Sequence, residues 1–380
     1  MQSPARPTAV TRLVRLLHDE GPMSRAAATT RLGLTRTAIG DAAGWLADAG
    51  VLAAAAAEPT GRGRPSPVLG FADRGPVVLA VHLKPRRAEV AVVGLGAEVV
   101  EQCGFTLPGQ GPRAVLKALA ARLTSVARRH GRPLVGVAVG LAGMTRPGGV
   151  VRNAVHFGWT DVPAEEVLRS ALPEGLPVRV ATDSGLTALA EQRRGAGRGD
   201  GPVLVLVGGH TGIGGALVGA ESHVLEVGHL SIDRKGLPCP CGQRGCLELY
   251  ADGRAVARNA GVPVDHLPHV LARAEAGAAR DTRAVLTAAD HLGTGLVNLL
   301  NVLAPAKVVL TGLLADLHRL GGDRITEHLG RSVIARADGT PVVAGAVAHP
   351  VLVGAAELAF EDFLTHPPLI DHCGQTTSWG

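Results

Sequence analysis

The stretch Glu226–Glu248 reads EVGHLSIDRKGLPCPCGQRGCLE and contains four side chains that commonly bind metals. Their spacing is H-x9-C-x-C-x4-C, and the residues are His229, Cys239, Cys241 and Cys246. One imidazole and three thiolates fill the tetrahedron of a structural zinc site and leave no open position for water. The glycines and prolines between the cysteines favour tight turns, which would bring ligands so close in sequence onto one ion. We therefore predict a structural Zn²⁺ ion.

Two other roles are open to these cysteines, as small core residues or as partners in a disulfide. Three cysteines within a short segment are an odd number, so a disulfide would leave one of them unpaired. The chain has five cysteines in all, and the remaining two, Cys103 and Cys373, suggest no disulfide framework. The number and type of these side chains therefore favour a metal site with four ligands over a disulfide.

The composition indicates a globular, cytoplasmic protein. The chain has 380 residues, of which 46% are hydrophobic and 2% aromatic, so its core must be built from Val, Leu and Ala. It has no run of eighteen apolar residues and no apolar signal segment at its N-terminus, so we expect neither a membrane span nor export. The formal charge is +5. Residues 1–72 carry eight Arg and no Lys against five acids, a net charge of +3 (8 − 5).

This basic N-terminal segment is predicted to fold as a helix-turn-helix. Apolar residues recur at helical spacing over residues 9–20, and Gly21 and Pro22 end that helix. Ser24 is placed to cap a second helix over 25–32, and Thr35 to cap a third from residue 36 to about residue 49. In a helix-turn-helix the third helix enters the major groove of DNA. Its exposed N-terminal end would present Thr35, Arg36 and Thr37.

Two short apolar stretches, 51–55 and 68–71, then flank the sequence GRGRPSP, residues 61–67. We interpret this segment as a β-wing, whose Arg62 and Arg64 can follow phosphates or reach into the minor groove. A plain packing or dimerisation module is the alternative for any three-helix segment. Asp41 on the third helix counts against DNA binding, unless it accepts a hydrogen bond from cytosine. The caps, the Arg-only basic charge and the Arg-bearing wing together favour binding to double-stranded DNA.

From residue 76 onward the pattern changes to strands mixed with helices, which is typical of an α/β fold. Three strands at 77–83, 88–95 and 99–105 begin it, and a helix over 112–129 and a buried strand at 134–143 follow. A long apolar-faced helix is expected at 283–303. The glycine loop Thr211–Gly215 can bind phosphate through its amides, although it continues as a strand and so does not match a dinucleotide fingerprint. Such loops are as often only turns.

Over residues 9–364 the sequence resembles members of the ROK family (repressors, open reading frames and sugar kinases). The most specific part is EVGH followed by C-x-C-G-x-x-G-C-L-E. The resemblance implies an actin-like (ribonuclease H-like) body of two α/β lobes around a cleft. It also implies that the glycine loop is functional, and that the head is the winged helix-turn-helix of the family's regulators.

The resemblance further implies a sugar site. Asp183 matches the catalytic base of the family's kinases, and a carboxylate there can accept a proton or a hydrogen bond from a sugar hydroxyl. Glu226, His229 and Glu248 match positions that bind sugar hydroxyls, so His229 would bind metal through one ring nitrogen and sugar through the other. The family's asparagines around the base are replaced by Thr182 and Gly185, and another by His156. These departures leave the ligand undefined.

The phosphate loop of the kinases is the main departure. The family carries Asp-x-Gly-Gly-Thr where this chain has His82, Leu83, Lys84, Pro85 and Arg86. No glycine remains, and proline has no amide proton to donate to a phosphate. Phosphoryl transfer depends on positioning the phosphates. We therefore expect the ATP site to be lost and the protein not to be an enzyme, with Asp183 as a vestigial base.

The fold class expected is α/β, with an N-terminal all-α winged helix-turn-helix head on a two-lobed sugar kinase-type body. The expected divisions are 1–72 for the head, 73–185 and 186–365 for the two lobes, and 366–380 for a disordered tail. The function expected is a transcriptional regulator, most simply a repressor, of carbohydrate metabolism or transport genes. It would act as a homodimer or homotetramer and respond to a sugar or sugar derivative. The alternatives are an active ATP-dependent sugar kinase and a regulator that needs no ligand.

Overall fold

The computed structural model describes residues 8–55, 68–109 and 111–367, which form two compact units. Unit 1 comprises Met1–Thr182 with Ala355–Gly380, and unit 2 comprises Asp183–Gly354. The predicted tail at 366–380 lies almost wholly outside the described residues.

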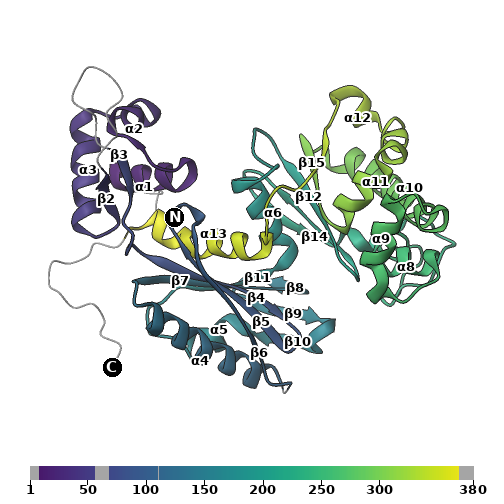
Figure 1. Ribbon diagram of the computed structural model, residues 1–380, viewed down its shortest axis with the longest axis horizontal. Coiled ribbons are helices and arrows are strands. Elements are labelled where there is room, and N and C mark those ends of the chain that lie inside the picture. The colour runs from purple at the N-terminus through teal and green to yellow at the C-terminus, as the bar shows by residue number, and fades with distance from the viewer. Residues whose placement is uncertain (1–7, 56–67, 110, 368–380) are drawn as a thin grey trace. The chain divides into compact units, whose positions relative to one another are not determined.

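The head of unit 1 is the predicted helix-turn-helix with its wing strands (Figure 1). Ser24 Oγ accepts a hydrogen bond from the amide of Ala27, and Thr35 Oγ1 accepts one from the amide of Ala38, each at 3.2 Å, so both predicted caps are present. The head also contains a two-residue strand that sequence periodicity does not reveal, and its sheet has the order β1-β3-β2. The elements are α1 (Ala9–Glu20), β1 (Met23–Ser24), α2 (Arg25–Leu32), α3 (Arg36–Asp48), β2 (Leu52–Ala55) and β3 (Val68–Phe71).

The rest of unit 1 is built on a five-stranded sheet of order β11-β7-β4-β5-β6. Its first three strands in the chain are antiparallel, and the other two run parallel to the first. The apolar side chains on one face of this sheet pack with α4 and α5. The elements are β4 (Val77–Lys84), β5 (Arg87–Gly94), η1 (Leu95–Ala97), β6 (Val99–Thr106), α4 (Pro112–His130), β7 (Leu134–Leu141), α5 (Ala164–Arg169) and β11 (Val178–Thr182).

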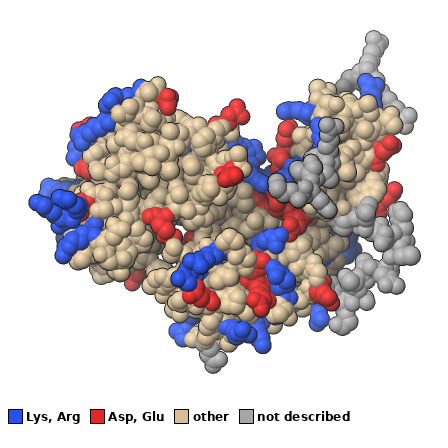
Figure 2. All heavy atoms as spheres, turned by 180° about the vertical axis from the view of Figure 1, so that it is seen from behind, with Lys and Arg blue, Asp and Glu red and all other residues tan. Residues whose placement is uncertain are grey.

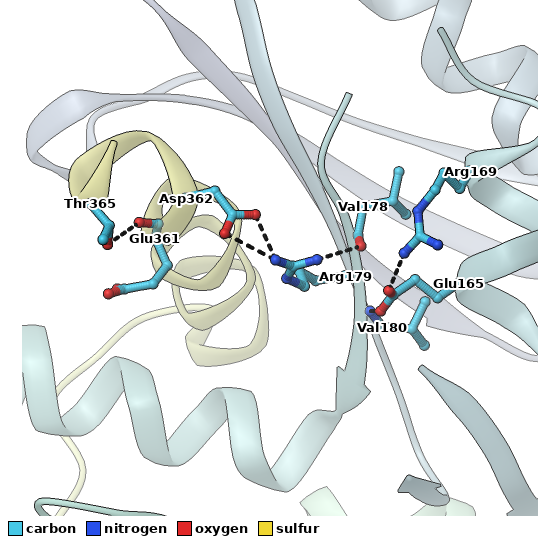
Figure 3. A network of polar contacts seen from close by, with 8 residues as sticks. All are labelled: Glu165, Arg169, Val178, Arg179, Val180, Glu361, Asp362 and Thr365. Atoms are coloured by element: carbon cyan, nitrogen blue, oxygen red, sulfur yellow. Dashed lines mark hydrogen bonds and ion pairs between the residues drawn. The ribbon is translucent and has the colours of Figure 1, made fainter. Parts of the chain in front are cut away.

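The C-terminal helix α13 (Pro350–Thr365) covers the other face of this sheet (Figure 1). The close approach requires Gly136 on β7, where an added Cβ would lie 2.4 Å from the carbonyl oxygen of Ala359. Arg179 on β11 also donates two hydrogen bonds, of 2.7 and 3.0 Å, to the carboxylate of Asp362 (Figure 3). On the same strand, the amide of Val180 donates to Glu165, which also binds Arg169. A small sheet of order β10-β9-β8 completes the unit, with β8 (Met144–Arg146), β9 (Val150–Ala154), η2 (Val155–Phe157) and β10 (Trp159–Pro163).

Unit 2 repeats the same sheet topology. Its strand order is β14-β13-β12-β15-β16, and again three strands are antiparallel and two run parallel to the first. Two sheets of one topology agree with the two α/β lobes that the family resemblance implies. The strands are β12 (Val203–Gly208), β13 (Ile213–Val218), β14 (Ser222–Leu225), β15 (Lys307–Gly312) and β16 (Val342–Ala344).

Strand periodicity divides the core of unit 2 into two layers. Leu204 and Leu206 pack with the long helix α10 and with α11, whereas Val203 and Val205 pack against α6 on the other face. The predicted long helix begins four residues earlier than expected. The helices are α6 (Asp183–Arg194), η3 (Val227–His229), α7 (Glu248–Ala251), α8 (Gly253–Ala260), η4 (Val264–His266), α9 (Leu267–Glu275), α10 (Ala279–Leu303), α11 (Leu313–Leu329) and α12 (Val333–Asp338).

Among the described residues, no helix combines the length and the apolar character that a membrane crossing requires. On the face drawn in Figure 2, acidic and basic side chains are interspersed between larger uncharged areas. The modest net charge is therefore not concentrated into a single field on that face.

Candidate functional site

The four predicted metal ligands come together in the segment 229–246, which we call the knuckle. It extends from the end of η3 to just before α7. Two isolated antiparallel β-bridges join the N-terminal part of this segment to its C-terminal part. One pairs Ser231 with Cys246, and the other pairs Pro238 with Arg244. The amide of Cys239 donates to the carbonyl of Gln243 at 2.8 Å, which closes the turn that contains Cys241. The chain at Gly245 passes very close to the segment that contains Asp233. A Cβ on Gly245 would lie 1.8 Å from the carbonyl oxygen of Asp233, so only glycine fits there.

The ligand atoms of His229, Cys239, Cys241 and Cys246 all lie within 4.8 Å of one another. The sulfur of Cys241 is 3.6 Å from that of Cys246, and the sulfur of Cys239 is 3.7 Å from Nδ1 of His229. A tetrahedral zinc ion with ordinary Zn–S and Zn–N bonds separates its ligands by about 3.6–3.8 Å, whereas a disulfide requires about 2 Å. The residues therefore fit a metal ion, and the separation of Cys241 from Cys246 excludes a disulfide between them.

The thiols of the knuckle differ in acidity. Burial raises the pKa of Cys246 to about 12, and burial also raises the pKa of Cys239. A backbone hydrogen bond involving Gln243 lowers the pKa of the exposed Cys241. Only a thiolate binds metal, so a bound cation must displace protons from the two buried thiols.

Glu248, at the first position of α7, lies against the metal cluster. One of its carboxylate oxygens is 3.6 Å from the sulfur of Cys239 and 3.8 Å from Nδ1 of His229. Because Nδ1 faces the cysteines, the other ring nitrogen of His229 remains for a second ligand. Two of the predicted sugar-binding residues are therefore adjacent to each other and to the metal ligands.

The glycine loop is the turn of the β12–β13 hairpin, so the predicted continuation as a strand is confirmed. The amide of Gly212 donates to Asp252 Oδ2 at 3.0 Å. A Cβ on Gly212 would lie 3.6 Å from a carboxylate oxygen of Glu248, and one on Gly214 would lie 2.9 Å from Cβ of Ser184. The loop therefore lies between the knuckle and the beginning of α6.

Asp183 begins α6 and is half-buried, and its carboxylate accepts a hydrogen bond of 2.7 Å from the amide of Ser184. Glu226 is exposed and immediately precedes η3. All four predicted sugar-binding residues thus belong to unit 2. His229 and Glu248 are in direct contact, and Asp183 is linked to them through the glycine loop. Their binding of a sugar stays a prediction.

Asp252 is a residue of this region that the motif analysis overlooked. It is fully buried and caps α8 by accepting from the amide of Ala255 at 2.9 Å, while its other oxygen binds Gly212 and Arg254. It fixes the glycine loop to the helix that follows the knuckle. The Asp-Gly pair at the start of this helix is a normal N-cap signal, which sequence reasoning can detect, although the contact with a loop forty residues earlier depends on the fold.

The turn that replaces the kinase phosphate loop is a tight hairpin. Lys84 and Arg87 pair directly across it, and Arg86 has a φ of 63°, a left-handed value that favours glycine. Lys84 Nζ donates to Glu89 at 2.9 Å. Burial and the charge of Lys84 lower the pKa of His82 to about 4, so this ring is neutral near pH 7. The turn lacks the acidic residue of the family motif and contains Pro85, which has no amide proton to donate. Loss of the ATP phosphate site stays a prediction.

In the head, Thr35, Arg36 and Thr37 are exposed at the first turn of α3, whereas Ile39 and Leu46 are buried in the head's own core. Arg36 forms no ion pair with any described residue. The wing residues Arg62 and Arg64 lie outside the described residues. DNA contact by these five residues stays a prediction.

Comparisons with known proteins agree with this architecture. A family model described as ROK family matches residues 79–362. A glucokinase of Halalkalibacterium halodurans is 34% identical over 206 residues, and that match covers 47% of this chain and 61% of the glucokinase. The DNA-binding transcriptional dual regulator NagC of Escherichia coli K12 is 24% identical over 335 residues, or 80% of each chain.

Among solved structures, a ROK family transcriptional regulator, described as a homolog of the E. coli MLC protein, has a TM-score of 0.76 to this chain. The superposition covers 92% of this chain and 94% of that one at 22% identity, so it concerns the fold. It extends beyond the matched family region and includes most of the head.

Proposed function

The chain belongs to the ROK family, and we propose that it is a DNA-binding transcriptional regulator, acting as a repressor, that responds to a sugar or sugar derivative. The observation that carries the proposal is the head, in which α2 and α3 are both capped and the first turn of α3 presents Thr35, Arg36 and Thr37 to solvent. The similarity to NagC over 80% of each chain and the superposition on a ROK regulator support it. Regulation of carbohydrate genes and a homodimer or homotetramer that reads paired half-sites complete the proposal.

The experiment that tests DNA binding is genome-wide mapping of bound sites, followed by titration of the recovered sequence. Arg36→Ala is expected to weaken operator binding by about tenfold or more, since one good contact to DNA contributes about 1–3 kcal/mol. The matched control is Arg25→Ala, which removes an equally exposed arginine from the start of α2. Failure to recover any reproducible site, or equal losses in both variants, would contradict the proposal.

We further propose that the knuckle binds Zn²⁺ and that Asp183, Glu226, His229 and Glu248 bind the sugar. The zinc would supply a rigid cross-link and fix the ring of His229, leaving its Nε2 for a hydroxyl. Thermal shift against hexoses and amino sugars tests the site. Asp183→Asn and Glu248→Gln should abolish stabilisation by any sugar that binds. If no sugar stabilises the protein while operator binding is intact, the ligand-independent regulator is the better description.

A sugar kinase is the second candidate, because Asp183 is retained beside the glycine loop and a glucokinase is 34% identical over 206 residues. The tight Pro85–Arg86 turn argues against it. A coupled assay of ADP release with the same sugars separates the two. Sugar-dependent turnover in the range of about 1–100 s⁻¹ typical of kinases would favour the enzyme. The regulator predicts turnover no higher than that of Asp183→Asn.

A further inference from the structure

Unit 2 contains a pocket between the knuckle and the helices α7, α8 and α10, and none of the residues proposed to bind sugar lines it. Its volume is about 550 Å³, within the range of about 300–1,000 Å³ common for small-molecule sites. We call it the knuckle pocket, and its principal lining residues are Lys235, Leu237, Arg244, Tyr250, Arg258 and His291. They come from the knuckle and from α7, α8 and α10.

The charge of the knuckle pocket is positive and not neutralised by ion pairs. Lys235, Arg244 and Arg258 form no ion pair with a carboxylate in the part of the chain that the structure describes. Arg244 instead donates to the carbonyl of Gly236 at 3.0 Å, and Arg258 to the carbonyl of Leu249 at 2.6 Å. These carbonyls hold the guanidinium groups in place but carry no formal charge. Each arginine therefore keeps further N–H donors for an anion.

Two acids, Asp233 and Asp290, lie close enough to act on the charge of the lining residue His291. Asp233 accepts the amide of Lys235 at 2.9 Å, and Asp290 binds Arg324 at 2.9 Å and His328 at 3.4 Å. No carboxylate side chain is among the residues that line the pocket. An incoming anion would therefore meet three cations and no carboxylate on the pocket wall itself, with the charge of Asp233 behind Gly236.

The uncharged wall of the pocket is fixed by Tyr250, the chain's single tyrosine. Its hydroxyl accepts a hydrogen bond of 2.7 Å from the amide of Leu237, and its ring lies 4.8 Å from that of His291. A Cβ on Gly236 would lie 2.1 Å from the Tyr250 oxygen, so glycine is needed for this contact. Leu237 remains 43% exposed beside it. The wall therefore offers a preformed apolar and aromatic surface.

We propose that the knuckle pocket binds a small molecule that carries a phosphate group. Arginine forms paired hydrogen bonds to phosphate oxygens, and a lysine adds a mobile point charge. The non-phosphate part of the ligand packs on Tyr250 and Leu237. This site is distinct from the proposed sugar site, since none of Asp183, Glu226, His229 and Glu248 lines it.

The test is calorimetric titration of the zinc-loaded full-length protein, in phosphate-free buffer, with inorganic phosphate and with phenyl phosphate. Phenyl phosphate carries an aromatic ring in place of a sugar and so avoids the sugar site. Both should bind, with phenyl phosphate the tighter. Arg244→Gln and Arg258→Gln should each weaken binding by about tenfold, which is 1.36 kcal/mol. The control Arg283→Gln removes the same charge from an exposed position on α10 outside this pocket.

Binding that is absent at millimolar concentrations, or that Arg283→Gln weakens as much as Arg258→Gln does, would overturn the proposal. Equal affinity for the two probes would overturn the part assigned to Tyr250 and Leu237. Thermal unfolding of each variant in the absence of phosphate separates loss of binding from loss of fold. Both pocket arginines are exposed, so their replacement should leave the unfolding temperature unchanged.

Discussion

Cys246 has the most buried environment of the metal ligands, with no exposed surface, and lies 3.6 Å from the sulfur of Cys241. Without a metal its thiol would stay protonated, because burial raises its pKa to about 12. A cation that replaces the proton therefore stabilises the folded knuckle, and losing it removes a cross-link between two arms of the chain.

Cys246→Ser is accordingly expected to abolish stoichiometric zinc binding and to lower the free energy of unfolding by about 4 kcal/mol or more. Metal analysis of the purified protein and urea unfolding measure the two effects. Cys103→Ser is the control, because Cys103 lies on β6 outside the cluster. Full zinc content in Cys246→Ser would contradict the four-ligand assignment.

His82 provides a pH prediction at the same scale. Its pKa is about 4 in the folded protein, mainly through burial, against 6.5 for a free side chain. The unfolded chain therefore takes up a proton below pH 6.5 that the folded chain accepts only near pH 4. The free energy of unfolding is therefore highest above pH 6.5, where His82 is neutral in both states, and it falls as the pH decreases from 6.5 towards 4.

Between pH 7.5 and pH 5.0 this loss should reach about 2 kcal/mol. His82→Gln removes the titrating group. Between the same two pH values, the loss in free energy of unfolding should be about 2 kcal/mol smaller in this variant than in the unmodified protein. Urea unfolding at the two pH values provides the comparison. Identical pH dependence of the two proteins would show that His82 does not titrate in this way.

Single residues differ in how far the sequence predicts them. The metal ligands are recoverable because their spacing is local and their chemistry is restrictive. The contact of Asp252 with Gly212 and the pairing of Tyr250 with His291 are not recoverable, because each joins segments about forty residues apart. Such contacts follow from the fold and leave no local pattern.

At the scale of elements, the capped helices are predicted to within a residue or two, as α1, α2 and α3 illustrate. The strands β8, β9 and β10 were missed, because they are short and no strict alternation distinguishes them. β11 ends at Thr182, and Asp183, the residue that resembles a catalytic base, is the first residue of α6.

The junction between α1 and α13 is an element-scale contact that no motif predicts. His18 is fully buried, with Nε2 at 3.2 Å from a carboxylate oxygen of Glu357, and its Nδ1 accepts from the amide of Gly96 at 3.0 Å. The ring also lies 5.4 Å from that of Phe360. One side chain of the head thus binds the C-terminal helix and the turn after β5 at the same time.

His18→Ala should destabilise unit 1 by about 3 kcal/mol, because it leaves a buried carboxylate without this partner. Arg15→Ala is the matched control, since Arg15 pairs with Glu361 on the same two helices at 2.9 Å but is partly exposed. An exposed pair of this kind contributes less than about 1 kcal/mol. Urea unfolding measures both changes, and equal costs would mean that the buried junction does not hold the head.

At the scale of the whole molecule, the duplicated sheet order was expected only through the family resemblance. Periodicity alone predicts an α/β class, because the two copies share topology without an obvious repeat in sequence. No sequence motif marks the residues at which the chain passes from one unit to the other. α13 begins in unit 2 and ends in unit 1, and β11 ends at Thr182, immediately before Asp183 begins unit 2.

Arg179 joins these two connections within unit 1, since it extends from β11 to Asp362 on α13 (Figure 3). The same helix holds the head through Glu357 and Glu361. If the proposed sugar site acts on DNA binding, a displacement at Asp183 can reach the head through β11, Arg179 and α13. Such coupling presupposes the proposed function, and a mutation tests it only if ligand binding and coupling are measured separately.

Arg179→Met is expected to change neither the affinity for sugar nor the affinity for operator in the absence of sugar by more than about twofold. It should reduce the sugar-induced change in operator affinity by about fivefold or more, which is the lower range of typical allosteric coupling. Titrating operator DNA with and without saturating sugar gives the coupling directly. Arg169→Met is the control, because Arg169 contacts Glu165 on the same unit without touching α13 in Figure 3. An unchanged sugar response in Arg179→Met, or an equal loss in the control, would show that the signal does not pass through the contact between β11 and α13.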